Sequence, residues 1–273
     1  MKIFIAVDME GISGIYSPEF VIRDGRLYAT GQRLLTRDVN AAVRGAFDGG
    51  AEEVIVADIH GGSGNILVEE LDPRALLLAG VPYKPRFPFL DRSVSGVFLL
   101  GYHAMAGTQG ANLEHTMSSA SWHCCKVNDK PYGELGIDAE LAAEAGVPVV
   151  LVSGDDKMCE EARAWLGTAE TAMVKQGLGR QAALCLSPER GNQVVYEHAR
   201  RAVERLKAGE TFFLPETPSP ARVAITYKMM PDADAANGYG TRRLDGYTVE
   251  TTYNRLSDWY GGIWSEYQTE QKL

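Results

Sequence analysis

The N-terminal stretch restricts the fold of this chain more than any other part of the sequence. Residues 3–7 form a short apolar run rich in β-branched side chains, which is typical of a central strand buried on both faces of a parallel sheet. Asp8 and Glu10 follow where the run ends, and residues two apart in an extended chain point to the same side. Gly11 and Gly14 then allow the chain to turn sharply. The stretch therefore predicts two carboxylates that converge beyond the carboxyl end of a strand, where α/β sheets bind ligands.

Two further apolar runs, residues 54–57 and 96–100, are followed by side chains of the same kinds. The acidic and imidazole residues at the ends of the three runs are Asp8, Glu10, Asp58, His60 and His103. Taken singly, each has an ordinary explanation, such as capping a loop or standing in solvent. Asp58 in particular is expected either to orient a ligand by hydrogen bonding or only to form a turn. Because parallel strands present their carboxyl ends at one edge of the sheet, the set as a whole favours a metal site.

Glu134 adds a third carboxylate from the start of a helix predicted to run through Ala145, although a helix N-terminus favours a carboxylate in any case. The candidate ligands are Asp8, Glu10, His60, His103 and Glu134. This set suits two divalent ions that share one bridging carboxylate. Zinc accepts such ligands, and a pair of ions can activate a water and polarise a carbonyl. No cysteine follows these strand ends, so a hydrolytic site is favoured over a structural zinc cage.

His115 lies in a loop without helical or alternating periodicity, the kind of segment that often carries functional side chains. It is not needed as a ligand, and an imidazole beside an activated water can carry protons or stabilise developing negative charge. His123 and Cys125 share one face of a predicted strand, where packing is favoured over a further metal site. His198 is expected to pack on a helix without a chemical role.

The rest of the chain alternates apolar runs with helical patterns, which predicts an α/β fold with a largely parallel sheet flanked by helices and a smaller C-terminal α/β lobe. Helices are predicted over residues 28–47, 133–145, 157–166 and 188–207. Further strands are predicted over residues 122–127, 147–152 and 172–174, with a short helix or turn over residues 67–78.

Pro215, Pro218 and Pro220 indicate a linker. We therefore expect residues 1–214 to form a metal-binding catalytic domain and residues 215–273 to form a small β-α-β-α lobe, packed into the same unit or at a subunit interface. The aromatic residues of its predicted last helix are assigned to core or subunit packing, and they are Trp259, Tyr260, Trp264 and Tyr267.

Composition excludes several classes of partner. The chain has 273 residues, 45% of them hydrophobic and 23% charged, which describes an ordinary globular protein. Its net charge of -9 argues against nucleic acid and anionic membranes as partners. The N-terminal apolar run lacks a cleavage site, and no stretch has the length of a membrane span. The four cysteines show no Cys-x-x-Cys pattern, so a cytoplasmic protein without a disulfide framework is expected.

Several motifs occur in a specific order along the first two thirds of the chain. They are Asp8-Met-Glu-Gly-Ile-Ser-Gly14, Asp58-x-His60, Gly101-Tyr-His103, Glu114-His115, Gly133-Glu-Leu-Gly136 and Leu186-Ser-Pro188. As a set they resemble the D-aminopeptidase family encoded in dipeptide transport operons. The sequence departs from the family pattern at Glu114, where a small hydroxylated residue is expected, and in a slightly longer stretch between His103 and His115. These departures concern the shape of the substrate pocket.

The resemblance implies a zinc-dependent aminopeptidase that hydrolyses short peptides, with D-amino acids at the N-terminus. It implies two zinc ions per chain, other divalent metals being compatible, with Asp8 as the bridge and a catalytic role for His115. The remaining implied ligands are Glu10, His60, His103 and Glu134. A homo-oligomer, as a ring-shaped decamer, is also implied.

Two alternatives stay open. One keeps the metals but acts on L-peptides or on another amide, as an L-specific aminopeptidase or a metal-dependent amidohydrolase. The other is a peptide-binding or metal-binding module without turnover, which the presence of the whole ligand set together with His115 disfavours.

Overall fold

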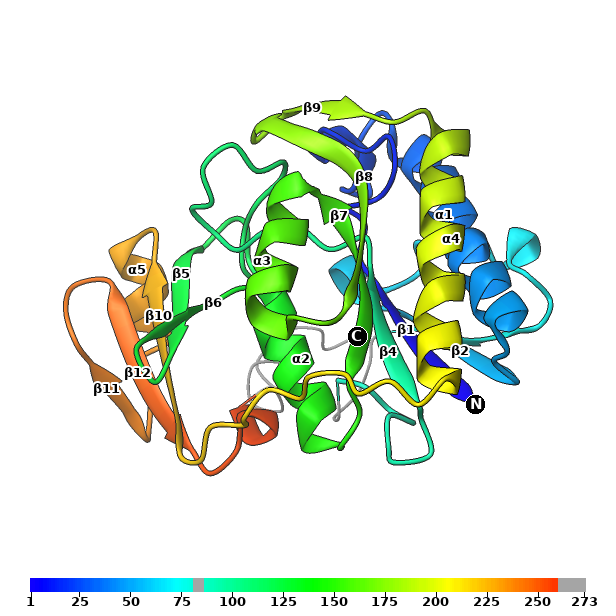
Figure 1. The fold of residues 1–273 in the computed structure, drawn as a ribbon. Helices are drawn as coiled ribbons and strands as arrows, with labels where there is room; N and C mark the ends of the chain where they lie inside the picture. Colours follow the sequence, from blue (N-terminus) through cyan, green and yellow to red (C-terminus); the bar gives the residue numbers. More distant parts are fainter. Residues whose placement is uncertain (81–85, 260–273) are drawn as a thin grey trace.

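Two β-sheets organise the protein in the computed structural model, which describes residues 1–80 and 86–259 (Figure 1). Sheet A contains β1 (Lys2–Val7), β2 (Glu53–Asp58), β3 (Ala75–Leu78), β4 (Gly96–Leu100), β7 (Val149–Asp155), β8 (Glu170–Gly179) and β9 (Ala182–Cys185). Within the described residues its order is β3-β2-β1-β4-β7-β8-β9. Every neighbouring pair is parallel except β8 and β9. The largely parallel sheet predicted from the sequence is confirmed.

β1 is a central strand, as its apolar run predicts. Ile5 pairs with Val56 of β2 on one side and with Phe98 of β4 on the other. Residues 3–7 are fully buried. Successive side chains alternate between the two faces of the sheet, so that Ile5 belongs to one hydrophobic core and Phe4 to a second.

Helices cover both faces of sheet A, which gives three layers (Figure 1). The helices on one face are α1 (Tyr28–Gly49) and α4 (Pro188–Lys207), and those on the other are α2 (Glu134–Glu144) and α3 (Asp156–Leu166). α1 ends where Gly50 adopts a φ of 112°, a left-handed conformation that glycine tolerates best. α4 begins at Pro188 after Ser187, whose side chain accepts a hydrogen bond from the Arg190 amide. The four predicted helices are confirmed.

A second, antiparallel sheet lies beside the first (Figure 1). Sheet B contains β5 (Trp122–Val127), β6 (Lys130–Tyr132), β10 (Ala221–Tyr227), β11 (Thr241–Arg243) and β12 (Thr248–Tyr253). Its order over the described residues is β11-β12-β10-β5-β6, and the short helix α5 (Met230–Ala235) follows β10. The strands come from both sides of the predicted boundary between residues 214 and 215. The division into domains at that point stays a prediction.

Some predicted elements differ from the structure. Residues 67–78 contain a single 3-10 turn (Val68–Glu70) and then the edge strand β3, where the sequence predicts only a helix or turn. The strand is not predicted because Pro73 lies just before it and because Leu76 is 55% exposed, so the segment does not have the pattern of a buried strand. β8 is longer than the predicted strand over 172–174. Most of the helix predicted from Leu256 lies outside the described residues.

Candidate metal centre

The predicted ligands meet at the carboxyl edge of sheet A. β1, β2 and β4 are neighbours in the sheet, so the residues that follow them start from adjacent positions. The side chains in question are Asp8, Glu10, His60 and His103. Asp8 and Glu10 converge through a turn, in which the Ile12 amide donates to the Met9 carbonyl at 3.2 Å. The prediction of convergence is therefore right, although an extended strand is not its cause.

Asp8 lies between the two histidines. Its Oδ1 is 2.9 Å from His60 Nδ1, and its Oδ2 is 3.4 Å from His103 Nε2. His60 Nδ1 is also 3.1 Å from Glu10 Oε2. Each oxygen of the Asp8 carboxylate thus faces a different imidazole, which is the arrangement expected of a carboxylate that bridges two ions.

Glu134 approaches from the first turn of α2. Its Oε1 is 3.3 Å from His103 Nε2 and 3.6 Å from His115 Nε2, and it accepts a hydrogen bond from the Met117 amide at 2.8 Å. The structure therefore brings all five predicted ligands and His115 into one cluster.

Backbone carbonyls orient the three imidazoles. His60 Nε2 donates to Val21 O at 2.9 Å, which leaves Nδ1 facing the carboxylates. His103 and His115 use Nδ1 in the same way, toward Ala104 O at 3.1 Å and Leu113 O at 2.9 Å. A hydrogen bond at one ring nitrogen selects the tautomer that presents the other nitrogen as a lone pair. Each ring is thus prepared to offer one nitrogen to the centre of the cluster.

The electrostatics of the metal-free protein follow from burial and close pairing. Burial lowers the pKa of His103, but the carboxylates of Glu134 and Asp8 outweigh burial and hold this pKa well above its usual value. The pKa of His60 is raised against burial by Glu10 and Asp8. Burial raises the pKa of Glu134, yet His103 and His115 lower it to about 2. A cation bound among these groups would take over the role of the imidazole protons.

The residues present fit a divalent cation. Glu10 Oε2 and His103 Nε2 are buried and make no well-aligned hydrogen bond within the described part of the chain, although charged partners lie 3.1 to 3.4 Å away. A bound cation would give both atoms a partner. Two groups place ligand atoms within 4.8 Å of one another, and they are Asp8 with Glu10 and His103, and His103 with His115 and Glu134. Imidazole nitrogen and carboxylate oxygen are the ligands of zinc in catalytic sites.

Asp58 does not face the cluster but supports the loop that carries His60. Its carboxylate accepts the Asn65 amide at 2.7 Å and the Asn65 side-chain nitrogen at 2.8 Å. That nitrogen also donates to His60 O at 2.8 Å. Of the two roles predicted for Asp58, the structure supports the orienting one.

Two groups of residues that support the cluster are not predicted from the sequence. Arg86 donates two hydrogen bonds to Asp138 of α2, at 2.6 and 2.9 Å, and Tyr102 Oη donates to the same carboxylate at 2.6 Å. This buried group ties α2, which carries Glu134, to the end of β4. Lys175 is the second, because its ammonium lies against the loop that follows Asp8. A lysine at the end of a predicted strand gives no signal of such a contact.

The other residues singled out in the sequence lie apart from the cluster. Glu114 turns toward Gly107 and toward Arg180, whose Nη1 lies 3.0 Å from its carboxylate. His198 of α4 contacts Glu170 of β8 at 2.9 Å. All four cysteines are free.

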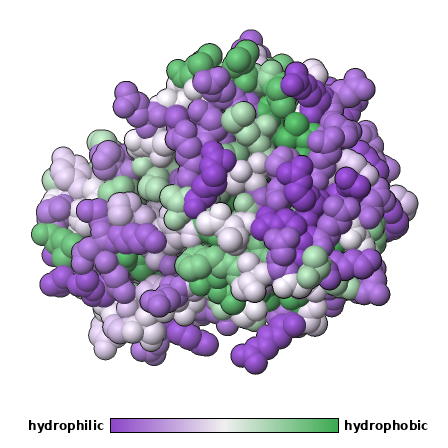
Figure 2. Space-filling model, viewed as in Figure 1, coloured by the Kyte–Doolittle hydropathy of each residue, from purple (hydrophilic) through white to green (hydrophobic). Residues whose placement is uncertain are grey.

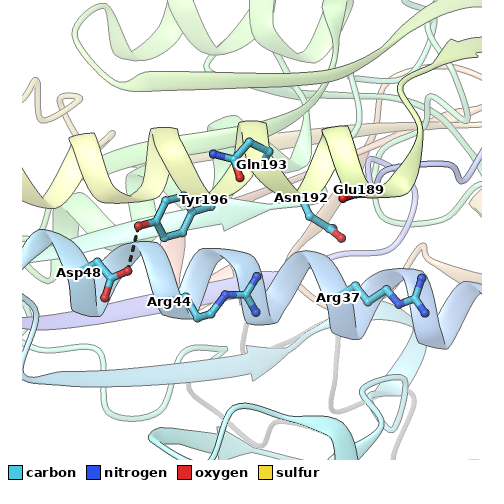
Figure 3. Close-up of a pocket in the computed structure, with 7 residues that line it drawn as sticks. All are labelled: Arg37, Arg44, Asp48, Glu189, Asn192, Gln193 and Tyr196. Carbon is cyan, nitrogen blue, oxygen red and sulfur yellow. Dashed lines mark hydrogen bonds between the residues drawn. The ribbon is translucent and has the colours of Figure 1, made fainter.

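An open polar groove between α1 and α4 lies away from the predicted ligands (Figure 3). Tyr196 Oη donates to Asp48 across it at 2.9 Å. It is lined by Arg37, Arg44, Asp48, Glu189, Asn192, Gln193 and Tyr196. None of these residues belongs to the cluster, so the chemistry is assigned to the carboxyl edge of sheet A.

The chain is similar to known proteins in both sequence and structure. The chain is 37% identical over 264 residues to a D-aminopeptidase of Bacillus subtilis (strain 168), covering 94% of this chain and 95% of the relative. Its structure resembles the Zn-dependent D-aminopeptidase DppA from Bacillus subtilis, described as a self-compartmentalizing protease, with a TM-score of 0.91. That match has 32% identity and covers 98% of this chain and 97% of the other. The sequence model of the Peptidase M55 family, described as D-aminopeptidase, matches residues 1–264, and the chain belongs to this family.

Proposed function

We propose that the protein is a zinc-dependent aminopeptidase that releases N-terminal residues, D-amino acids in particular, from short peptides. The observation that carries the proposal is the position of Asp8, whose two oxygens face His60 at 2.9 Å and His103 at 3.4 Å. The relatives named above support the metal and the substrate class.

The proposed centre holds two zinc ions, with Asp8 as the bridging carboxylate. Glu10 and His60 complete the ligands on one side of it, and His103 and Glu134 complete those on the other. The contacts support this division, because Glu10 approaches His60 at 3.1 Å and Glu134 approaches His103 at 3.3 Å. When bound, the ions would polarise the scissile carbonyl and lower the pKa of a bound water to near neutrality.

His115 is proposed to move the proton. Its Nδ1 is occupied by Leu113 O, so Nε2 is the atom that takes a proton from the attacking water and returns it to the leaving amine. Its Nε2 lies 3.6 Å from Glu134 Oε1, which keeps the ring at the edge of the cluster. Glu134 is thereby suited to stabilise the imidazolium that this proton transfer creates.

A preference for a free N-terminus requires the protein to hold the substrate's ammonium while the scissile carbonyl meets the reacting groups. These two contacts leave handedness to the pocket that receives the side chain. We propose that a wall of this pocket excludes the L-isomer, because exchanging the substituents on Cα would drive the side chain into that wall.

The test is release of free alanine from matched D-Ala and L-Ala dipeptides and amides, with metal analysis of the same preparation. We expect faster release of D-Ala and loss of release after treatment with a chelator. Equal or reversed rates would refute D-preference and favour the L-specific or amidohydrolase alternative. Metal binding without any release would favour a non-enzymatic module.

We further propose that the chain assembles into a homo-oligomer, a ring-shaped decamer by family resemblance. Leu178 and Leu184 are 64% and 66% exposed on the β8–β9 hairpin, and Figure 2 shows apolar surface along the same upper edge. Exposed apolar side chains grouped on one edge are typical of a surface that another subunit covers. Light scattering that gives the mass of a monomer at working concentration would contradict assembly.

A cytoplasmic location is proposed on the free state of all four cysteines, which is typical of a reducing compartment. Among the described residues, no helix is both long and apolar enough to span a membrane.

A further inference from the structure

Lys175 is a buried cation directed inward by an irregularity in β8. Asp155 of β7 pairs with Lys175 while Gly154 pairs with Met173, so Val174 is an extra residue in β8. Met173 is 50% exposed, and regular alternation would place Lys175 on the same face, yet Lys175 is only 2% exposed. Bulges of this kind redirect side chains and are common beside active sites. The bulge thus places a lysine where a regular strand would not.

The ammonium of Lys175 binds the loop that carries two predicted ligands. Its Nζ donates to Glu10 O and to Ile15 O, both at 2.5 Å. It also interacts electrostatically with the carboxylates of Asp155, Glu10 and Asp38. A buried ammonium is costly unless acceptors surround it. The two carbonyls and the acidic surroundings therefore account for its position.

Other contacts hold the same loop at different points. The Gly11 amide donates to Gly101 O at 2.7 Å, next to the end of β4. The Ser13 amide donates to Asp38 Oδ2 at 2.8 Å, on α1. Of these anchors, Lys175 contacts Glu10 itself, at the backbone oxygen.

We propose that Lys175 is a positioning residue of the metal centre. By fixing the carbonyls of Glu10 and Ile15, it sets the direction in which the Glu10 carboxylate leaves the backbone and so holds this carboxylate on its ion. The inference rests on the proposed metal centre. Groups that orient metal ligands change metal affinity by about 10- to 100-fold when they are removed.

A purely structural lysine predicts a different result. If Lys175 only stabilises the fold, its replacement lowers stability and leaves zinc affinity unchanged. Val174→Ala is a matched control, because Val174 is the buried neighbour of Lys175 in β8. This substitution removes packing but leaves the hydrogen bonds from Lys175 to the loop in place.

The experiment compares the wild type with Lys175→Met, which keeps an unbranched side chain but removes the charge and the donors. Zinc dissociation constants are measured by competition with a chromophoric chelator, and exchange of the Gly11 amide is followed by hydrogen exchange in the metal-free protein. We expect Lys175→Met to weaken the binding of one of the two zinc ions by about 10- to 100-fold. We also expect it to speed hydrogen exchange of the Gly11 amide. Val174→Ala should change the affinity by less than about twofold, although it lowers stability.

A milder variant covers the case in which Lys175→Met does not fold. Lys175→Gln retains a donor, and we expect its zinc affinity to fall between those of the wild type and the Met variant. Wild-type zinc affinity in a folded Met or Gln variant would overturn the positioning role and leave the proposed function standing. A wild-type protein that binds no zinc would overturn the metal centre itself.

Discussion

The imidazole of His103 stacks on that of His115, with ring centroids 3.9 Å apart and planes 10° from parallel. Both rings donate a hydrogen bond from Nδ1 to a backbone carbonyl. Both present Nε2 toward Glu134 Oε1, His103 at 3.3 Å and His115 at 3.6 Å. The stack gives the two histidines nearly the same orientation, but among the ion pairs of the described residues His103 contacts Asp8, at 3.4 Å, and His115 does not. This difference underlies the assignment of His103 as a ligand and of His115 as a proton carrier.

His115→Ala separates these two roles. We expect the variant to retain its metal and to lose at least about a hundredfold in kcat, the lower range for a positioned acid or base. Metal content and kcat are measured on the same sample. His198→Ala is the control, because His198 of α4 pairs with Glu170 of β8 at 2.9 Å and is not one of the clustered residues, and its rate should stay unchanged. Loss of metal from His115→Ala would identify His115 as a ligand instead.

Gly11 is expected to tolerate no side chain. A Cβ at this position would lie 1.9 Å from Tyr102 O and 2.6 Å from Gly101 C, both backbone atoms. Gly11→Ala therefore forces the loop that carries Glu10 away from the end of β4. We expect the free energy of unfolding to fall by about 3 kcal/mol or more and zinc binding to weaken.

Gly238→Ala is the matched control for this prediction. A Cβ at Gly238 meets nothing within 4 Å, so its effect should stay within about 0.5 kcal/mol. Urea unfolding of both variants gives the comparison, and equal stabilities would refute the close approach at Gly11.

Glu140 makes the stability of the protein depend on pH. Burial raises the pKa of Glu140 to about 7, against the hydrogen bond that Tyr132 donates to it. A carboxyl whose folded pKa is raised contributes stability that is fully present below its ordinary pKa of 4.5 and is lost as pH rises through about 7. The loss amounts to at most about 3 kcal/mol.

Glu140→Gln tests this dependence. The amide retains an oxygen for the Tyr132 hydroxyl but does not ionise. We expect the wild type to lose stability relative to this variant between pH 5 and pH 8, as measured by urea unfolding at several pH values. A stability difference that stays constant over this range, or that changes in the opposite direction, would show that Glu140 titrates normally.

The centre of the fold could be predicted because its signals are local. The apolar run over residues 3–7 reads as a buried strand, and ligand-type residues follow it and its two neighbours in the sheet. Parallel strands end at a common edge, so even the meeting of Asp8, His60 and His103 follows from the pattern.

The features that could not be predicted from the sequence depend on contacts between segments far apart in the chain. β10 pairs with β5 in sheet B, and no local pattern connects residues so far apart in the chain. Asp138 reads as one acidic residue in a helix until Arg86 and Tyr102 are placed beside it. Lys175 turns inward only because of a bulge, which depends on the register between β7 and β8.

The bridging role of Asp8 is the central claim, and anomalous diffraction at the zinc absorption edge tests it most directly. Crystals of the zinc-loaded protein should show two anomalous peaks about 3.5 to 4 Å apart, each about 2.0 to 2.2 Å from one oxygen of Asp8. Crystals of Asp8→Asn should lose at least one peak, because the bridge serves both ions. A single peak in the wild type, or two peaks that Asp8 does not join, would contradict the account.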